Sequence, residues 1–220
     1  MSNEYEVSKR NRVRQIKELA KYDKETVHAI LDSALLASVG FVQDGQPVVV
    51  PMLFGRDGET VYLHGARKAR IIRLLAETQT ACLNITHVDA LVYARSAFNS
   101  SMNYRSVTVY GTPRLIEDHD EKLAALRIIS ESTMPGRWDE VRDSHINEIK
   151  MTGVIGLTID TASAKVSSGM PDDEDEDYDI PIWAGILPLK SAFTEIESDQ
   201  RLVEGVAPSA AVLAMQHKVL

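Results

Sequence analysis

The sequence VYLHGARKARII contains the residue types best suited to binding an anion. A strand pattern ends at His64 and Gly65, and a helical pattern follows at once with Arg67, Lys68 and Arg70 at its start. The N–H groups and positive dipole end of a helix N-terminus bind phosphate, whereas three cations there are unfavourable unless an anion offsets them. The segment therefore favours a phosphate-bearing ligand. The alternative is a surface helix whose basic side chains have no such role.

Two features interrupt the apolar strand patterns: a proline, Pro51, and a polar segment, residues 95–106. Proline has no N–H to donate to a neighbouring strand, so Pro51 in VVVPMLF belongs at a sheet edge or a bulge. It marks either a plain edge strand or an edge with a flat ligand beside it. The segment RSAFNSSMNYRS either lines a site or forms a solvent-facing loop, because buried polar groups need partners.

Trp183 and His64 are the remaining side chains that could contact a ligand. Trp183, in DIPIWAGILPL, brings a large apolar surface and one donor, which suits either the core or packing against a ring system. His64 shares a strand face with Tyr62 and could contact a ligand or donate a proton, or serve a structural role.

Several kinds of catalytic site lack support in this sequence. It contains no Walker loop, no Gly-x-Gly-x-x-Gly after a strand, no Gly-x-Ser-x-Gly and no His-x-x-x-His. The six histidines are scattered, and the single cysteine, Cys82, excludes an internal disulfide and a cysteine-based metal cluster. No metal site is predicted, and hydrolase and metalloenzyme functions are not favoured.

The composition favours a cytoplasmic globular protein. The 220 residues carry 32 acidic and 24 basic side chains, a net charge of −8 that argues against broad nucleic-acid binding. No apolar run approaches the roughly 18 residues of a membrane span, and no secretory signal is visible. Five cations lie between Lys9 and Lys17, where a basic arm could bind an anionic partner or simply be solvated.

Helical and extended patterns alternate along the chain. Apolar spacing predicts a terminal helix within residues 1–20 and a second helix capped by Asp23. Two Asp-Gly pairs between β-branched runs predict a three-stranded antiparallel meander over 37–64. Further helices are expected at 67–77, 119–133 and 144–151, and further strands at 79–93, 103–117, 153–166 and 183–190.

Six or so antiparallel strands, with helices at specific connections, predict an α+β fold built on a β-barrel. The expected organisation is an N-terminal helical arm at 1–20, one domain at 21–192 and a C-terminal tail at 193–220.

Long stretches of the sequence resemble a known family. The stretches are YDKETVHAILDSALLASVGFVQDGQPVVVPMLF, VYLHGARKAR, ARSAFNSSMNYRSVTVYG and PIWAGILPL, in that order. They are similar to the FMN-binding split-barrel proteins related to pyridoxamine 5′-phosphate oxidase, in the branch that includes nitroimidazole-resistance proteins. The resemblance covers roughly residues 21–192.

The resemblance implies a mainly β fold, a six-stranded antiparallel split β-barrel with flanking helices, which forms a homodimer with FMN in clefts at the subunit interface. The expected substrate is a small molecule, and neither nucleic acid nor a membrane is an expected partner. His64 is the expected catalytic residue. The residues expected to bind FMN are Val49, Val50, Pro51, Met52, Leu53, Leu63, His64, Gly65, Lys68, Arg70, Arg105, Ser106 and Trp183. Of these, Trp183 would reach the flavin from the second subunit, and Arg105 would stabilise reduced flavin as a positive group near N1.

Two departures from the oxidase pattern bear on the activity. Ala69 replaces the first of two adjacent basic residues at the phosphate, and the C-terminal Arg-x-His substrate motif is missing. Oxidation of pyridoxamine phosphate is therefore not expected. The favoured function is an FMN-dependent oxidoreductase acting on a nitro compound or quinone. The alternatives are a flavin carrier or sensor without turnover, and a haem-binding protein with His64 or His87 as the axial ligand.

Overall fold

The computed structural model describes residues 2–220, and the contacts among them define two compact units. The first unit comprises residues 2–31, 84–109 and 161–190, and the second comprises 32–83, 110–160 and 191–220. Because the chain passes back and forth between the units, neither unit is a continuous stretch of sequence. The predicted domain boundaries at residues 20 and 192 remain predictions.

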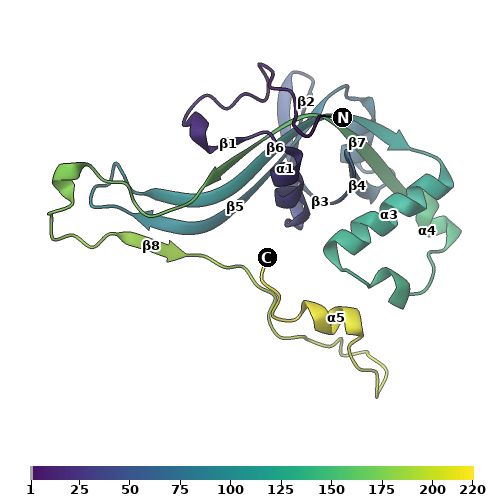
Figure 1. Ribbon diagram of the computed structural model, residues 1–220. Coiled ribbons are helices and arrows are strands. Elements are labelled where there is room, and N and C mark those ends of the chain that lie inside the picture. Colours follow the sequence, from purple (N-terminus) through teal and green to yellow (C-terminus); the bar gives the residue numbers. More distant parts are fainter. Residues whose placement is uncertain (1) are drawn as a thin grey trace. The chain divides into compact units, whose positions relative to one another are not determined.

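Residues 2–220 form eight strands and five α-helices (Figure 1). The strands are β1 (Ala20–Lys21), β2 (Leu36–Gln43), β3 (Gln46–Asp57), β4 (Thr60–Ala66), β5 (Ala81–Tyr93), β6 (Ser101–Ile116), β7 (Thr152–Ser167) and β8 (Gly185–Pro188). The α-helices are α1 (Lys24–Asp32), α2 (Arg70–Glu77), α3 (His119–Thr133), α4 (Ile146–Met151) and α5 (Ala210–Met215). Short 3₁₀ turns form η1 (Lys17–Leu19), η2 (Trp138–Glu140) and η3 (Asp175–Asp177).

The second unit is organised around the meander β2–β3–β4, which continues to β7. At the first turn, Asp44 and Gly45 both have positive φ, of 50° and 74°, as a two-residue hairpin loop requires. At the second turn, Gly58 has a φ of 54°. The meander predicted from the two Asp-Gly pairs is therefore confirmed.

Helix α3 covers β3 and β4 within the second unit. Its N-terminus is capped by Asp118, whose side chain accepts a hydrogen bond of 2.9 Å from the N–H of Glu121. The helix lies so close to β3 that a Cβ on Gly55 would stand 2.8 Å from the backbone of Ile128 and Ile129. A glycine is needed there for this packing.

The first unit is a long β5–β6 hairpin with shorter strands beside it. Figure 1 shows β8 running along β5, and their register pairs Ala90 with Pro188 and Tyr93 with Gly185. Strand β1 pairs with the end of β7. Near the tip, the guanidinium of Arg95 contacts the fully buried carboxylate of Asp173 at 3.0 Å.

The order of strand pairing supports the predicted fold class. The path β7–β4–β3–β2–β5–β6 returns to its start through a further β6–β7 pairing, so six antiparallel strands pair in a closed order. The fold is mainly antiparallel β with flanking helices, as predicted. Among residues 2–220, no helix combines the length and apolar composition needed to cross a bilayer.

The predicted helix within residues 1–20 is wrong. Residues 2–16 contain no helix, and only η1 follows. Asn11 explains the difference, because its buried amide accepts from the N–H of Ser8 at 2.7 Å and donates to the carbonyl of Ala162 at 2.9 Å. The tertiary hydrogen bonds of Asn11 thus outweigh a weak helical propensity, which repulsion between the neighbouring cations lowers further.

Gly111 of β6 provides a test of how closely β6 and β7 approach. A Cβ there would overlap the carbonyl oxygen of Thr158 and the side chain of Leu157. We expect Gly111→Ala to cost about 3 kcal/mol and to lower the Tm by about 6–12 °C. Gly58→Ala is the control, because a Cβ at Gly58 has no atom within 4 Å and only the positive φ is unfavourable. Thermal unfolding followed by circular dichroism measures both, and equal losses would contradict the packing argument.

Candidate cofactor site

His64 of β4 lies half-buried opposite Val154 of β7. Its Nδ1 is buried and has no hydrogen-bond partner. Burial lowers the pKa of this imidazole, so the ring is neutral at neutral pH. A buried polar atom without a partner is costly in a folded protein, which suggests that a bound molecule satisfies the ring.

The ring lines a pocket of about 300 Å³ in the second unit. Its lining is mostly apolar, consisting of Leu53, Leu126, Ile129, Met134, Trp138 and Ile149, with the polar residues Ser130, Thr133, Ser144, Glu148 and Thr152. A second cavity of about 240 Å³ shares Trp138, Ser144 and Ile149 with the first. Together they offer an apolar space large enough for an aromatic group next to a neutral imidazole.

Glu148 is the one carboxylate in the pocket wall, and its charge is neutralised by Arg142. The guanidinium of Arg142 donates to both carboxylate oxygens, at 2.9 and 2.6 Å, and the N–H of His145 donates at 2.8 Å. The hydrogen bonds from Arg142, followed by that from His145, lower the pKa of Glu148 to about 2. The carboxylate is therefore held at the rim as part of an ion pair.

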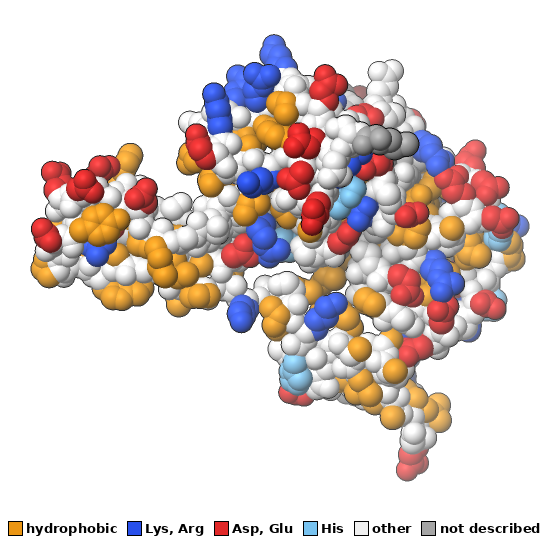
Figure 2. Space-filling model, viewed as in Figure 1, with side chains coloured by type: hydrophobic (Ala, Val, Ile, Leu, Met, Phe, Trp, Pro, Cys, Tyr) orange, Lys and Arg blue, Asp and Glu red, His pale blue; other side chains and the backbone are white. Residues whose placement is uncertain are grey.

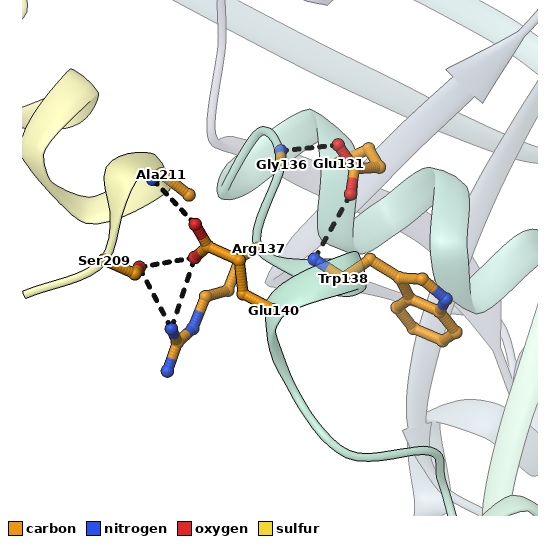
Figure 3. Close-up of polar contacts among 7 residues, drawn as sticks. All are labelled: Glu131, Gly136, Arg137, Trp138, Glu140, Ser209 and Ala211. Carbon is orange, nitrogen blue, oxygen red and sulfur yellow. Dashed lines mark hydrogen bonds and ion pairs between the residues drawn. The ribbon is translucent and has the colours of Figure 1, made fainter.

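Trp138 lines both cavities, and Glu131 of α3 fixes its backbone (Figure 3). The carboxylate of Glu131 accepts from the N–H of Gly136 at 2.7 Å and from the N–H of Trp138 at 3.3 Å. On the other side of this corner, Glu140 accepts from the N–H of Ala211 at 3.0 Å and so caps α5. The corner that carries the indole is thus held from two directions.

Removing the Glu131 carboxylate should loosen Trp138. We expect Glu131→Ala to shift the fluorescence emission of Trp138 to the red and to raise its quenching by acrylamide, because two backbone N–H groups lose their acceptor. The measurement uses a Trp183→Phe background, in which Trp138 is the sole tryptophan. Glu131→Gln keeps one acceptor and should give an intermediate result. Emission identical to the parent in both variants would show that Glu131 does not position the indole.

Strand β3 has an unpaired edge where the flavin is expected. It pairs with β2 from Gln46 to Leu53, but its pairing with β4 begins only at Phe54. Among the described residues, the opposite edge from Gln46 to Leu53 therefore has no strand partner. The edge position predicted from Pro51 is confirmed, and the free backbone groups suit a flat polar ring system.

The outer face of β2 and β3 is apolar and exposed. Leu36 lies opposite Leu53. Val42 pairs with Pro47, and the next pair on the same face is Gly40 with Val49. Each of the four leucine and valine side chains is at least 41% exposed, and Val49 reaches 66%. Exposed apolar patches of this kind mark interaction sites more often than plain surface.

The start of α2 fits the predicted phosphate site. Its N-cap residue, Ala69, provides no side-chain acceptor for the first-turn N–H groups. Lys68 is exposed, Arg67 forms a partly exposed ion pair with Glu117 at 3.4 Å, and Arg70 donates to the side chain of Gln43. An uncapped helix start with three accessible cations is a favourable environment for an anion.

The polar segment of the first unit is a hydrogen-bonded ladder between β5 and β6. The hydroxyl of Ser106 lies 2.9 Å from that of Thr86 and donates to the carbonyl of Ile85 at 3.1 Å. Asn84 donates to the hydroxyl of Thr108 at 3.0 Å. Asn84 and Thr86 were not predicted as site residues, although both alternate with buried residues in the stretch LNIT, a sign of an outward polar strand face.

Arg105 and Trp183 also lie in the first unit. The guanidinium of Arg105 forms a bidentate pair with Asp89, with contacts of 2.9 and 3.0 Å, so much of its charge is already neutralised. Trp183 is 69% exposed, and its ring lies 5.8 Å from that of Tyr93, tilted by 55°. The roles predicted for both residues stay predictions.

The structure brings part of the predicted site together in the second unit. Leu53 and His64 line the same pocket, and the β3 edge, Gly65 and the α2 start belong to the same unit. Leu63 and Met52, by contrast, are buried in the core and contribute through packing. The pocket itself was missed, because the residues of α3 that line it read as an ordinary core stripe.

Comparisons with known proteins identify the family. The chain matches the pyridoxamine 5′-phosphate oxidase family over residues 23–166, more than half of its length. The chain therefore belongs to this family of flavin-binding split-barrel proteins. No curated protein matches it.

Three solved structures are similar to this chain. The flavocytochrome Anf3 from Azotobacter vinelandii is 39% identical, with a TM-score of 0.89 over 96% of this chain and 98% of that chain. The FAD and haem binding protein from Mycobacterium smegmatis is 35% identical, with a TM-score of 0.87 over 90% and 98%. A proposed 5-nitroimidazole antibiotic resistance protein from Bacteroides thetaiotaomicron is 27% identical, with a TM-score of 0.57 over 67% and 86%.

Proposed function

We propose that this chain is an electron-transfer protein that binds both a flavin and haem, with His64 as an axial ligand of the haem iron. The observation that carries the proposal is the buried, unpartnered Nδ1 of His64 in an apolar pocket. Two proteins similar to this chain over at least 90% of its length are a flavocytochrome and an FAD and haem binding protein, which supports it.

The residues around His64 suit a haem group. The ring is neutral, as an iron ligand must be, and apolar side chains dominate the lining. The Glu148–Arg142 ion pair keeps an unbalanced carboxylate out of the pocket. Trp138, held by Glu131, offers a flat apolar ring in the lining of both cavities.

The residues of β3 and α2 suit a flavin. The free β3 edge offers backbone donors and acceptors to the ring, and the cations at the α2 start would neutralise the phosphate. The similarity to a protein named for FAD favours FAD over the FMN expected from the sequence. When bound, the flavin exchanges two electrons and the haem one, so the pair could link two-electron and one-electron partners.

Reduction of a small aromatic acceptor, such as a nitro compound or quinone, is a second candidate function. It is favoured by the similarity to the proposed nitroimidazole resistance protein and by the space beside His64. In that case the acceptor, and no haem, would occupy the pocket.

A homodimer is part of the proposal. The exposed apolar face of β2 and β3 adjoins the free β3 edge, so a second copy placed there would cover the face and shield the flavin. Cofactor affinity would then depend on association of the two copies.

Arg70 allows a direct test of the phosphate assignment. A charge-assisted hydrogen bond contributes about 1.5–3 kcal/mol, so Arg70→Ala should weaken flavin binding roughly 10- to 100-fold. Titration of the flavin-free protein, followed by flavin fluorescence, measures the change. Arg73→Ala is the control, because Arg73 lies one turn further along α2 and is exposed. Equal affinity of the Arg70 variant and the parent would remove Arg70 from the site.

The proposed function is tested by the visible spectrum of the purified full-length chain, before and after release of its cofactors. We expect a Soret band together with oxidised-flavin bands, and chromatography of the released flavin then distinguishes FAD from FMN. Flavin bands without haem binding, even after haem is added, would favour reduction of a small acceptor over electron transfer through haem. A protein that binds neither cofactor would contradict the proposal.

A further inference from the structure

The segment from Lys9 to Lys17, called the basic loop below, belongs to the first unit. Between Lys9 and Lys17 five of nine side chains are cationic and none is acidic, in a chain whose net charge is −8. All five cationic side chains are exposed. Figure 2 shows Lys and Arg side chains gathered over this N-terminal segment, the darkest purple in Figure 1. The loop is therefore a local basic patch on a chain whose net charge is negative.

The basic loop is anchored at several points along the chain. Asn11, in the middle of the loop, is only 3% exposed, and its side-chain amide donates hydrogen bonds to the carbonyls of Glu6 and Ala162, at 3.0 and 2.9 Å. The N–H of Val13 donates to the hydroxyl of Tyr22 at 2.9 Å, and β1 pairs with β7 just beyond the loop. These contacts hold the loop in one conformation, so its cations form a patch of defined shape.

Four of the five cations of the basic loop have no ion-pair partner among residues 2–220. Among the described residues, Lys9, Arg12, Arg14 and Lys17 form no ion pair. Like charges gathered in one short loop repel each other and oppose folding. An external partner of opposite charge would offset that cost.

We propose that the basic loop docks the acidic face of a small electron-carrier protein that reduces this chain. The inference rests on the proposed redox function, which requires an electron source. Weak electron-transfer encounters use small interfaces and rely on complementary charge, which a loop of nine residues can supply. A long polyanion such as nucleic acid would meet the repulsion of the remaining acidic surface.

Each encounter transfers one electron. The carrier is oxidised by one electron, and the cofactor bound to this chain gains that electron. Two encounters are needed where the acceptor takes two electrons. Complementary charge raises the association rate by roughly 10- to 1,000-fold at low salt, and salt screens the effect.

The experiment compares reduction of the cofactor-loaded protein by a reduced acidic [2Fe–2S] ferredoxin and by reduced methyl viologen, in stopped flow. The test variant is Arg12→Glu, Arg14→Glu and Lys17→Glu. The control variant, Lys150→Glu, Lys190→Glu and Arg201→Glu, makes the same charge change at exposed sites elsewhere. We expect the test variant to lose 10- to 100-fold in rate with ferredoxin at low salt and to lose most of the salt dependence, while the control variant stays within about threefold of the parent.

The outcomes separate this proposal from the proposed function. A rate with viologen that is equal in all three proteins shows that the cofactors work and that only docking has changed. Equal ferredoxin rates in the test and control variants, or a parental rate insensitive to salt, would overturn the docking site. Binding of the parent, but not the test variant, to anionic vesicles, without any effect on ferredoxin, would replace the protein partner by a membrane surface. Failure of viologen to reduce the parent would instead overturn the redox function.

Discussion

Replacing His64 with alanine should abolish most haem binding while the flavin stays bound. The imidazole is the one basic ring that lines the apolar pocket in the part of the chain the structure describes, and its buried Nδ1 has no other partner. Without it the iron loses its protein ligand, so we expect haem affinity to fall at least about 100-fold, which corresponds to about 2.7 kcal/mol. The flavin contacts expected at the β3 edge and the α2 start are left intact.

The measurement is a haem titration of His64→Ala and the parent, followed by the Soret band, with the flavin bands recorded in the same spectra. Added imidazole should enter the space left by the side chain and restore part of the Soret intensity. The control is His87→Ala, because the sequence left His87 open as an alternative ligand, and burial, followed by the charge of Arg105, lowers its pKa too. Loss of the Soret band in the His87 variant, with retention in the His64 variant, would exchange their roles. Loss of both cofactors from His64→Ala would point to a folding defect, which circular dichroism detects.

The elements set by local chemistry were predictable from the sequence. Helix α3 spans 119–133 as expected, because Asp118 caps it and its apolar residues keep a helical spacing. The meander turns were predictable because positive φ is demanded where glycine stands, at Gly45 and Gly58. In such segments the neighbouring residues in the sequence determine the backbone conformation, so a single sequence is enough to predict it.

The elements set by distant contacts were not predictable. The conformation of the N-terminal segment is fixed by the buried side-chain amide of Asn11, which donates a hydrogen bond to Ala162, 151 residues away in sequence. The pocket around His64 also depends on distant contacts. Leu126, Ile129 and Trp138 reach it only because α3 folds back over β3 and β4 and η2 packs against α3. A single sequence shows these residues as core, and the opening beside them becomes visible only in three dimensions.

A glutamate at Val49 should convert the proposed dimer into monomers. Val49 lies opposite Gly40 in the β2–β3 pair, beside the cross-strand pair of Val42 and Pro47, and its side chain is 66% exposed. Burying one carboxylate in such an interface without a partner costs several kcal/mol, so we expect the dimer Kd to rise on the order of 100-fold or more. Because the free β3 edge adjoins this face, flavin affinity should fall in parallel.

The measurement is sedimentation velocity at micromolar concentration, with the bound flavin followed by its absorbance. Val203→Glu is the matched control, since it makes the same substitution at a side chain that is 74% exposed in the C-terminal segment. The control should sediment like the parent and keep its flavin. A parent that is monomeric with flavin bound, or a Val49→Glu protein that stays dimeric, would rule out the β2–β3 face as the interface. Monomers that keep full flavin affinity would instead separate the two roles of this face, because cofactor binding would then need only one copy of the chain.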